Sequence, residues 1–282
     1  MTRVLIVGIH TFDSGKTHLA IELGRAFINA GRSVEYFKPI SGHNYWYNYQ
    51  HTLKCLEIGQ LVSKDAMLVK ETLGIDSDLR LMNPIHSLFV PSRIDRPLET
   101  IPNSLGLSGS TSILTMQRFS QPLSDEIDTT VLIAESLVEE EHLLIGFDEV
   151  GKLTHETSVS SADSLEAFQE FEMLYFDKYV TSSFSKISRS TDVVIIEAFN
   201  DAAWPWEALE SVDHVFVVCP GHIFSYDPER FRKAAFLMKR GNLPIREVTF
   251  GRMSDLLKPS RKLEIRPQCS LSSSDLYALG ID

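Results

Sequence analysis

Cysteine is scarce in this sequence, and the few cysteines are not grouped. Cys55, Cys219 and Cys269 lie far apart and are odd in number. A disulfide framework needs paired cysteines, and a zinc-binding knuckle needs closely spaced ones. The sequence favours neither, and we expect the three residues to behave as small, partly buried apolar side chains.

The sequence also lacks a basic surplus and long apolar runs. Lys and Arg number 27 against 38 Asp and Glu, which gives a formal net charge of −11, and no basic block of the kind that binds nucleic acid stands out. No apolar run approaches the ~20 residues that cross a bilayer, and no signal-peptide pattern precedes the first strand. We expect a cytoplasmic protein that binds neither nucleic acid nor membrane.

Apolar residues nevertheless make up 43% of the 282 residues, and charged residues make up 23%. These values are close to the averages for globular domains, so a sizeable core is expected. Neither an internal repeat nor a low-complexity tract is present. The length fits one large α/β domain over residues 1–282 that carries an insertion.

Five short runs rich in branched residues predict strands buried on both faces. After the first run, Leu19, Leu23 and Phe27 recur at helical spacing, and residues 230–240 repeat this pattern. Because a strand, a helix and a strand alternate, parallel pairing with right-handed crossovers is favoured. The predicted strands are Val4–Val7, Ser33–Phe37, Val193–Ala198, His214–Cys219 and Glu247–Phe250.

The middle of the chain has a different pattern. Ser112–Arg118, Thr129–Ala134 and Leu143–Phe147 are strand-like pieces separated by polar turns rather than by helices. Residues 164–185 then predict one long helix. We therefore predict an antiparallel, strand-rich insertion at about residues 105–160, set into a mostly parallel sheet that helices flank in three layers.

The loop between the first strand and the first helix ends in Gly15-Lys16-Thr17, which is typical of a P-loop. Gly15 would let the backbone approach a phosphate, and the amides at the helix start would point at the anion. Lys16 would lie between the terminal phosphates, and Thr17 would give its hydroxyl to Mg²⁺. The residues expected to bind the nucleotide are His10, Thr11, Asp13, Ser14, Gly15, Lys16 and Thr17.

His10 stands where the strict motif G-x-x-x-x-G-K-[ST] has glycine. A residue with a side chain fits there if its backbone angles are ordinary. An accidental Gly-Lys-Thr is the alternative, but the strand, loop and helix in register favour a P-loop. We expect His10 to be a loop residue near phosphate rather than a general base.

Two further groups suit phosphoryl transfer. The run Asp192–Glu197 ends a hydrophobic strand in a carboxylate, at the edge where an open parallel sheet exposes its functional residues. Lys38 follows the second predicted strand. Two lysines with a carboxylate-held Mg²⁺ would neutralise the charge on a transferring phosphoryl group. For Lys38 the alternative is a solvated lysine at a turn. For Asp65, a carboxylate at the start of a helix-like stretch, the alternative to binding Mg²⁺ is that it only stabilises the helix N-terminus.

Four segments in order resemble dethiobiotin synthetase and its relatives among the P-loop ATPases. They are the loop at 10–17, Tyr36–Gly42, Ser63–Ala66, and Met82–Pro84 followed by Pro91. The resemblance implies a three-layer P-loop fold, ATP and Mg²⁺ as cofactors, and a homodimer that binds substrate across its interface. In that family an amine takes up carbon dioxide, and the resulting carbamate attacks the γ-phosphate before a second amine closes a cyclic urea.

The resemblance also implies roles by position. Lys16, Lys38 and Glu197 would be catalytic, with Lys38 near the γ-phosphate, and Ser41 would touch the acceptor. The residues expected around Mg²⁺ are Thr17, Asp65 and Glu197.

Three features depart from that family. Phe199 and Asn200 follow Glu197 where the family has a glycine-rich turn, so we expect both to line the acceptor site and to change its shape. The aromatic run at 45–49 suits a flat ligand or a dimer partner, or packs beneath the insertion. Residues 251–253 lack the asparagine with which the family often recognises the adenine base.

The leading hypothesis is a Mg²⁺-dependent ATP-binding enzyme that activates a carboxylate or carbamate of a small-molecule acceptor by γ-phosphoryl transfer. One alternative is an ATP-dependent switch or assembly factor that docks through the insertion and the aromatic run. Another is a polynucleotide 5′-kinase, because Asp13–Thr17 also resembles the loop of such RNA kinases. The acidic balance argues against the kinase.

Overall fold

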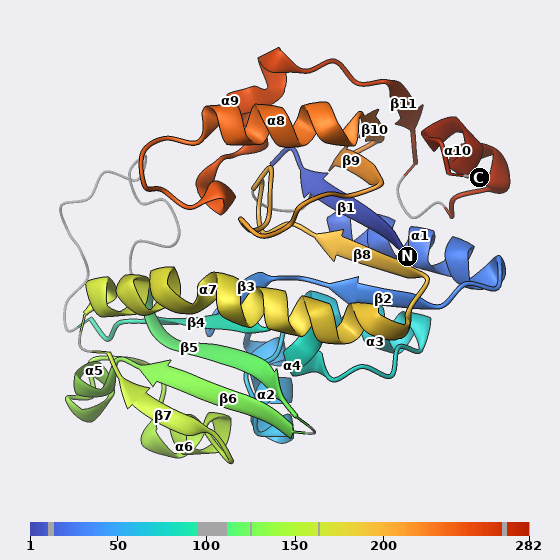
Figure 1. Cartoon of the computed structure of the whole chain (residues 1–282). Helices are drawn as coiled ribbons and strands as arrows, with labels where there is room; N and C mark the ends of the chain where they lie inside the picture. The colour runs from blue at the N-terminus through green and yellow to red at the C-terminus, as the bar shows by residue number, and fades with distance from the viewer. Residues whose placement is uncertain (11–13, 95–111, 125, 163, 267–269, 282) are drawn as a thin grey trace.

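The computed structural model describes residues 1–10, 14–94, 112–124, 126–162, 164–266 and 270–281. These residues form an α/β structure with two mixed sheets and helices around them (Figure 1). Loop residues 11–13, Cys269 and the first part of the predicted insertion lie outside the described residues. The two described cysteines, Cys55 and Cys219, are free and are buried and half-buried, as predicted.

The first sheet has the strand order β11-β10-β9-β1-β8-β2. Its four strands β9, β1, β8 and β2 are parallel, whereas β10 and β11 are antiparallel to their neighbours. The sheet is therefore mixed, with its parallel part where parallel strands were predicted. The bounds are β1 Thr2–Gly8, β2 Val34–Phe37, β8 Val193–Glu197, β9 His214–Cys219, β10 His222–Tyr226 and β11 Arg261–Glu264.

Strand β1 is buried on both faces because its side chains alternate between two cores. Val4 and Ile6 pack with α1 (Lys16–Asn29) and α3 (Lys64–Leu73). Leu5 and Val7 belong to the second core, which also contains residues of α7 (Leu165–Ile187) and α8 (Pro228–Met238). The predicted long helix and the helix near residues 230–240 are thus confirmed as α7 and α8.

The second sheet has the order β3-β4-β5-β6-β7. Its central pairs β4–β5 and β5–β6 are antiparallel, and its outer pairs β3–β4 and β6–β7 are parallel. Figure 1 shows α7 crossing between the two sheets, and its residues share one core with both of them. The bounds are β3 Ile40–Asn44, β4 Ile85–Pro91, β5 Ser112–Leu123, β6 Glu126–Ile133 and β7 Ser158–Ser161.

The antiparallel strands predicted in the middle of the chain are present as β5 and β6, but they are not set into the parallel sheet. Strand β5 pairs instead with β4, which pairs with β3, and β6 pairs with β5. The second sheet thus combines the middle of the chain with segments that follow α1. Sequence pattern predicted the strands correctly and their place in the parallel sheet incorrectly, because pairing between segments distant in sequence leaves no local signal.

Two predicted strands are wrong. Leu143 makes only an isolated bridge to Ser92, and the helix α6 (Phe147–Leu153) begins where the strand was expected to end. Glu247–Phe250 is instead the end of a 3₁₀ turn, η2 (Ile245–Glu247), and the start of α9 (Phe250–Met253). Val248 and Phe250 are buried, so the apolar pattern indicated burial correctly. A short apolar run does not distinguish a buried strand from another buried segment.

The remaining elements connect these layers. Among the described residues, no helix combines the length and the apolar character needed to cross a bilayer. The connecting elements are α2 Tyr49–Ile58, α4 Leu79–Met82, α5 Glu135–Glu139, η1 Ser188–Ser190, η3 Ser254–Leu256 and α10 Ser273–Leu279.

Candidate functional site

The loop after β1 leads directly into the N-terminus of α1. Gly15 is the residue before the helix and has φ 89°, the left-handed region that glycine enters without strain. Having no side chain, it leaves the first amides of α1 without a side-chain cap. Helix N-terminal amides of this kind attract anions. The described part of the loop therefore has the backbone features predicted for a phosphate site.

The loop is held by Ser14 and by the end of β1. Ser14 Oγ donates to the carbonyl of His10 at 2.7 Å and accepts from its N–H at 3.2 Å. A Cβ at Gly8 would lie 2.8 Å from Ser14 Oγ and 2.9 Å from Lys16 Nζ. Only glycine leaves room there. The sequence pattern did not single out Gly8, although a glycine at the end of a strand before a phosphate loop is a usable signal.

Three charged groups meet beside this loop. Lys38 Nζ donates to Glu197 Oε1 at 2.8 Å and also to Asp65. Lys38 is 7% exposed and Glu197 is 1% exposed. Burial lowers the pKa of Lys38, but the carboxylates of Glu197 and Asp65 outweigh it and raise the pKa above its ordinary value. The structure thus brings together the predicted second lysine and both predicted carboxylates.

Glu197 lies at the centre of this cluster. The Tyr36 hydroxyl donates to Glu197 Oε2 at 2.8 Å, and the Thr17 hydroxyl donates to Oε1 at 3.3 Å. Sequence reasoning assigned no role to Tyr36, which lies in β2 two residues before Lys38. Because side chains two positions apart on an extended chain point to the same side, both reach Glu197. The predicted Mg²⁺ residues Thr17, Asp65 and Glu197 are therefore neighbours around one ammonium group.

Asp65 fits both roles weighed for it. It lies in the first turn of α3, after the N-cap Ser63, where a carboxylate favours the helix dipole. It also pairs with Lys38. Burial raises the pKa of Asp65, but Lys38 outweighs this and lowers it below its ordinary value.

Lys16 is held differently. Its Nζ donates to the backbone carbonyl of Asn200 at 2.8 Å, and burial lowers its pKa. Asn200 has φ 49°, a left-handed conformation that asparagine tolerates better than most residues. The carbonyl of Asn200 thus contacts Lys16.

A cleft of about 470 Å³ lies at the carboxyl ends of β1 and β8, whose arrows point to the same edge in Figure 1. It joins the phosphate loop to the charged cluster and to the predicted acceptor residues. Open sheets bind ligands at this edge. Predicted residues that line the cleft are Ser14, Gly15, Lys16, Thr17, Lys38, Ser41, Asp65, Glu197, Phe199 and Asn200.

Beside Ser41, a buried chain of hydrogen bonds that the sequence did not reveal reaches the cleft. His86 Nδ1 lies 2.6 Å from Ser41 Oγ, and His86 Nε2 lies 2.7 Å from His43 Nδ1. His43 Nε2 lies 3.2 Å from Thr52 Oγ1. Burial lowers the pKa of His43 to about 3 and that of His86 well below its ordinary value, so both rings are neutral near neutral pH.

Asn83, at the end of this series of hydrogen bonds, determines which atom donates and which accepts at each step. Asn83 Nδ2 donates to the carbonyls of Lys38 and Ile85, so Asn83 Oδ1 is the atom that accepts the Ser41 hydroxyl at 2.9 Å. Ser41 Oγ must then accept from His86 Nδ1–H, and His86 Nε2 from His43. Ser41 therefore offers the cleft a lone pair and no proton.

His43, His51 and Cys55 have ligand atoms within 4.8 Å of one another. Hydrogen bonds account for this cluster, because both ring nitrogens of His43 are engaged and His51 Nε2 lies 2.7 Å from the carbonyl of Val62. Burial raises the pKa of Cys55 to about 11, which keeps it a thiol. We assign no metal to this cluster.

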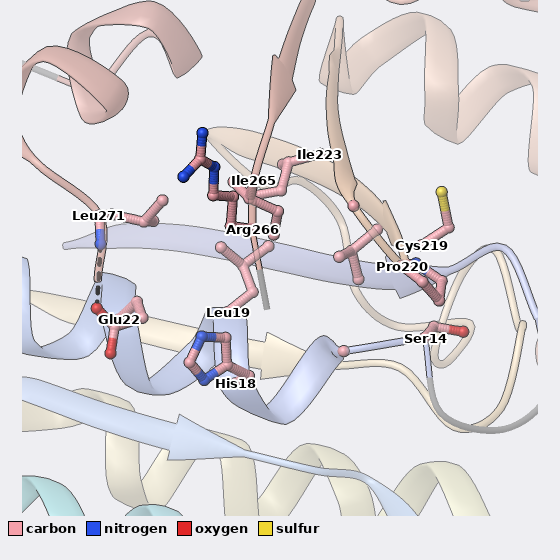
Figure 2. A pocket seen from close by; sticks show the side chains of 13 residues that line it. Ser14, His18, Leu19, Glu22, Cys219, Pro220, Ile223, Ile265, Arg266 and Leu271 are labelled. Carbon is pink, nitrogen blue, oxygen red and sulfur yellow. Dashed lines mark hydrogen bonds between the residues drawn. The ribbon is translucent and has the colours of Figure 1, made fainter. Parts of the chain in front are cut away.

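A second hollow of about 230 Å³ lies on the other side of the phosphate loop, and Figure 2 shows its walls. Ser14, Gly15 and His18 line both this hollow and the cleft, so the two meet at the start of α1. Glu22 accepts the N–H of Leu271 at 3.1 Å across it. Its walls are mainly apolar and include Leu19, Val218, Pro220, Ile223, Ile265 and Leu271.

Two groups of residues singled out in the sequence, residues 251–253 and the aromatic residues of the run at 45–49, line neither hollow. Gly251–Met253, where the base-reading asparagine was missing, is part of α9 and lines neither one. In the aromatic run, Tyr45 is buried and donates to Glu149 at 3.0 Å, as expected for packing, whereas Trp46 and Tyr47 are 64% and 66% exposed. The aromatic side chains of the run do not line the cleft.

No protein-family model, curated protein or solved structure matches this chain.

Proposed function

We propose that this chain is a Mg²⁺-dependent ATP-binding enzyme that activates a carboxylate or carbamate of a small-molecule acceptor by γ-phosphoryl transfer, as dethiobiotin synthetase does. One observation carries the proposal: Lys16, Lys38 and the Glu197 carboxylate converge in one cleft at the N-terminus of α1. The four parallel strands β9-β1-β8-β2 support the three-layer P-loop fold that belongs to the proposal.

The donor set suits a magnesium ion. The hydroxyl of Thr17 and the carboxylates of Asp65 and Glu197 are hard oxygen ligands, which Mg²⁺ prefers. When bound with ATP, Mg²⁺ supplies positive charge to the β- and γ-phosphate oxygens. Lys38 pairs with both carboxylates, so it competes with a cation for them.

The chain's own groups then account for phosphate binding. The first amides of α1 would bind the phosphates, and Lys16, whose Nζ donates to the carbonyl of Asn200, would donate to a phosphate oxygen. Lys38 would direct its ammonium at the γ-phosphate and stabilise the charge that develops during transfer. Ser41 and Phe199 face the same cleft and position the acceptor.

The apolar hollow in Figure 2 suits the base of the nucleotide, because it adjoins the phosphate loop and its walls are aliphatic. The choice of ATP follows from the resemblance, as does the expectation of a homodimer. Glu22 lines the hollow and accepts hydrogen bonds, so amino groups of a base would find an acceptor there.

Steady-state turnover of Mg²⁺-ATP by the full chain tests this function, with release of ADP as the readout and small carboxylates or amines with bicarbonate as acceptors. Lys16→Ala should abolish release, since it removes an ammonium from the phosphate site. Lys54→Ala is the matched control, because Lys54 is exposed on α2 outside the cleft. Turnover that survives in Lys16→Ala would refute the assignment.

An ATP-dependent switch is the second candidate, and the exposure of Trp46 and Tyr47 favours it, since exposed aromatic residues are enriched in protein interfaces. A switch must bind its partner differently in two nucleotide states. Equal partner affinity with ADP and with a non-hydrolysable ATP analogue would eliminate it.

A further inference from the structure

A separate cavity of about 190 Å³ lies behind Ser41, between the second sheet and α7. It shares Ser41, Gly42 and Phe199 with the cleft, so the two spaces adjoin. None of the proposed phosphate or metal groups lines it. Its remaining walls come from Ile40, Ser87, Phe89, Leu114, Gln117, Glu172, Arg246 and Glu247.

Gly42 occupies the edge position of a row in the sheet that forms one wall of the cavity. Gly42 pairs with Ser87, and Ser87 pairs with Gln117, and residues in register on neighbouring strands share a face. A Cβ at Gly42 would lie 3.2 Å from Phe89 Cε2 and 3.2 Å from the carbonyl of Ser87. A side chain at this position would therefore crowd the wall, and α7 and η2 contribute the facing walls through Glu172, Arg246 and Glu247.

The polar groups of this cavity have one unmet acceptor. Gln117 Nε2 donates to Glu172 Oε2 at 2.7 Å and to Ser87 Oγ at 3.1 Å, which fixes the orientation of the carboxamide. Gln117 is 1% exposed, and its Oε1 has no hydrogen-bond partner among the described residues. A buried acceptor without a donor is rare in folded proteins.

The charges favour a donor as well. Arg246 donates to Glu172 Oε1 at 2.7 Å and lies over the ring of Phe176 at 3.8 Å, so its charge is already paired. Each Glu172 oxygen accepts one hydrogen bond and can accept another. With Glu247 at the rim, one negative charge is left over in the cavity walls.

We propose that this cavity binds the end of the acceptor molecule remote from its reacting group, and that this end is an N–H donor such as an ammonium or a primary amide. The role as an acceptor subsite rests on the proposed phosphoryl transfer, whereas the preference for an N–H donor does not. The volume holds on the order of six water-sized groups. A short aliphatic linker therefore passes Ser41 and Phe199, and its donor end reaches Gln117 and Glu172.

Titration of the nucleotide-free full chain with n-butylammonium, n-butanol and n-butyrate tests this inference. The readout is the side-chain NH₂ resonance of Gln117 in nitrogen-15 NMR spectra, assigned by its loss in Gln117→Leu. Butylammonium should shift this resonance saturably and butyrate should not. Saturable binding of butyrate at this resonance, or no shift with butylammonium at any concentration, would overturn the inference.

Two variants distinguish binding in this cavity from a non-specific effect of butylammonium on the protein. Glu172→Gln keeps the shape of the side chain and should weaken butylammonium binding by about tenfold or more, because it removes a charged hydrogen bond. Gln121→Leu, on the same strand outside the cavity, is the matched control and should bind as the parent does. Equal affinity in Glu172→Gln and the parent would contradict the proposal.

The two proposals fail separately. Lys16→Ala should bind butylammonium like the parent, since Lys16 does not line the cavity. A chain that turns over ATP without binding butylammonium refutes only the inference drawn here. A chain that binds butylammonium but no nucleotide leaves an N–H donor site that is not an acceptor subsite.

Discussion

Lys38→Met should destabilise the folded chain strongly at neutral pH and make its stability depend on Mg²⁺. The substitution removes the ammonium that pairs with Glu197, a carboxylate only 1% exposed. Removing one partner of a buried ion pair costs about 3–5 kcal/mol, out of a typical free energy of unfolding of roughly 5–15 kcal/mol. We assign this cost to Glu197, because Asp65 is 36% exposed and better solvated.

Two dependences distinguish this explanation from simple loss of packing. The carboxylates of the variant no longer compete with Lys38 for a cation, so Mg²⁺ should restore stability by about 2.7 kcal/mol at a hundredfold excess over its Kd. Lys38 has a raised pKa, so in the parent its contribution is complete below its ordinary pKa of 10.5 and is lost as the pH rises through the folded value.

Urea unfolding of both chains, with Mg²⁺ and with EDTA, measures these effects. Lys54→Met is the matched control for loss of an exposed lysine. The double variant Lys38→Met/Glu197→Gln should recover much of the loss without Mg²⁺, because no buried charge remains unpaired and the Tyr36 hydroxyl can still donate to the amide oxygen. A Lys38→Met chain with the same free energy of unfolding as the parent, or one whose free energy of unfolding is the same with Mg²⁺ and with EDTA, would refute this explanation.

Three further predictions concern other positions of the chain. Gly8→Ala should weaken Mg²⁺-ATP binding in calorimetry by about tenfold, an effect near 1.4 kcal/mol, because its Cβ would displace Ser14 and Lys16. Gly151→Ala, a helical position with open space, should instead stabilise the chain by about 0.5–1 kcal/mol. His43 is neutral in the folded chain, with a pKa of about 3 against 6.5, so its contribution to stability is present above pH 6.5 and falls by roughly 1.4 kcal/mol per pH unit below it. Urea unfolding of His43→Gln between those values should show a shallower pH slope than the parent; equal slopes would contradict the assignment.

The part of the site that the sequence predicted is the part encoded in contiguous segments. The phosphate loop, Lys38 and Glu197 each follow a strand whose apolar run is visible in the sequence. Parallel strands bring such endings to one edge, so local pattern was enough to predict that these groups share a cleft.

The rest depends on pairing between distant segments. Ser41 and His86 meet because β3 and β4 pair in a particular register, and no local pattern fixes that register. The unpaired oxygen of Gln117 depends on β5 lying beside β4 and on α7 lying over both. Glu247–Phe250 was wrongly predicted as a strand, because a buried turn carries the same apolar pattern as a buried strand.

Calorimetric titration of ATP into the full chain, with Mg²⁺ and with EDTA, tests the central claim most directly. The proposed site predicts saturable binding that requires Mg²⁺ and that weakens by about tenfold or more in Lys16→Ala, since a charged hydrogen bond to phosphate is lost. Absence of binding by any nucleoside triphosphate in the presence of Mg²⁺ would contradict it.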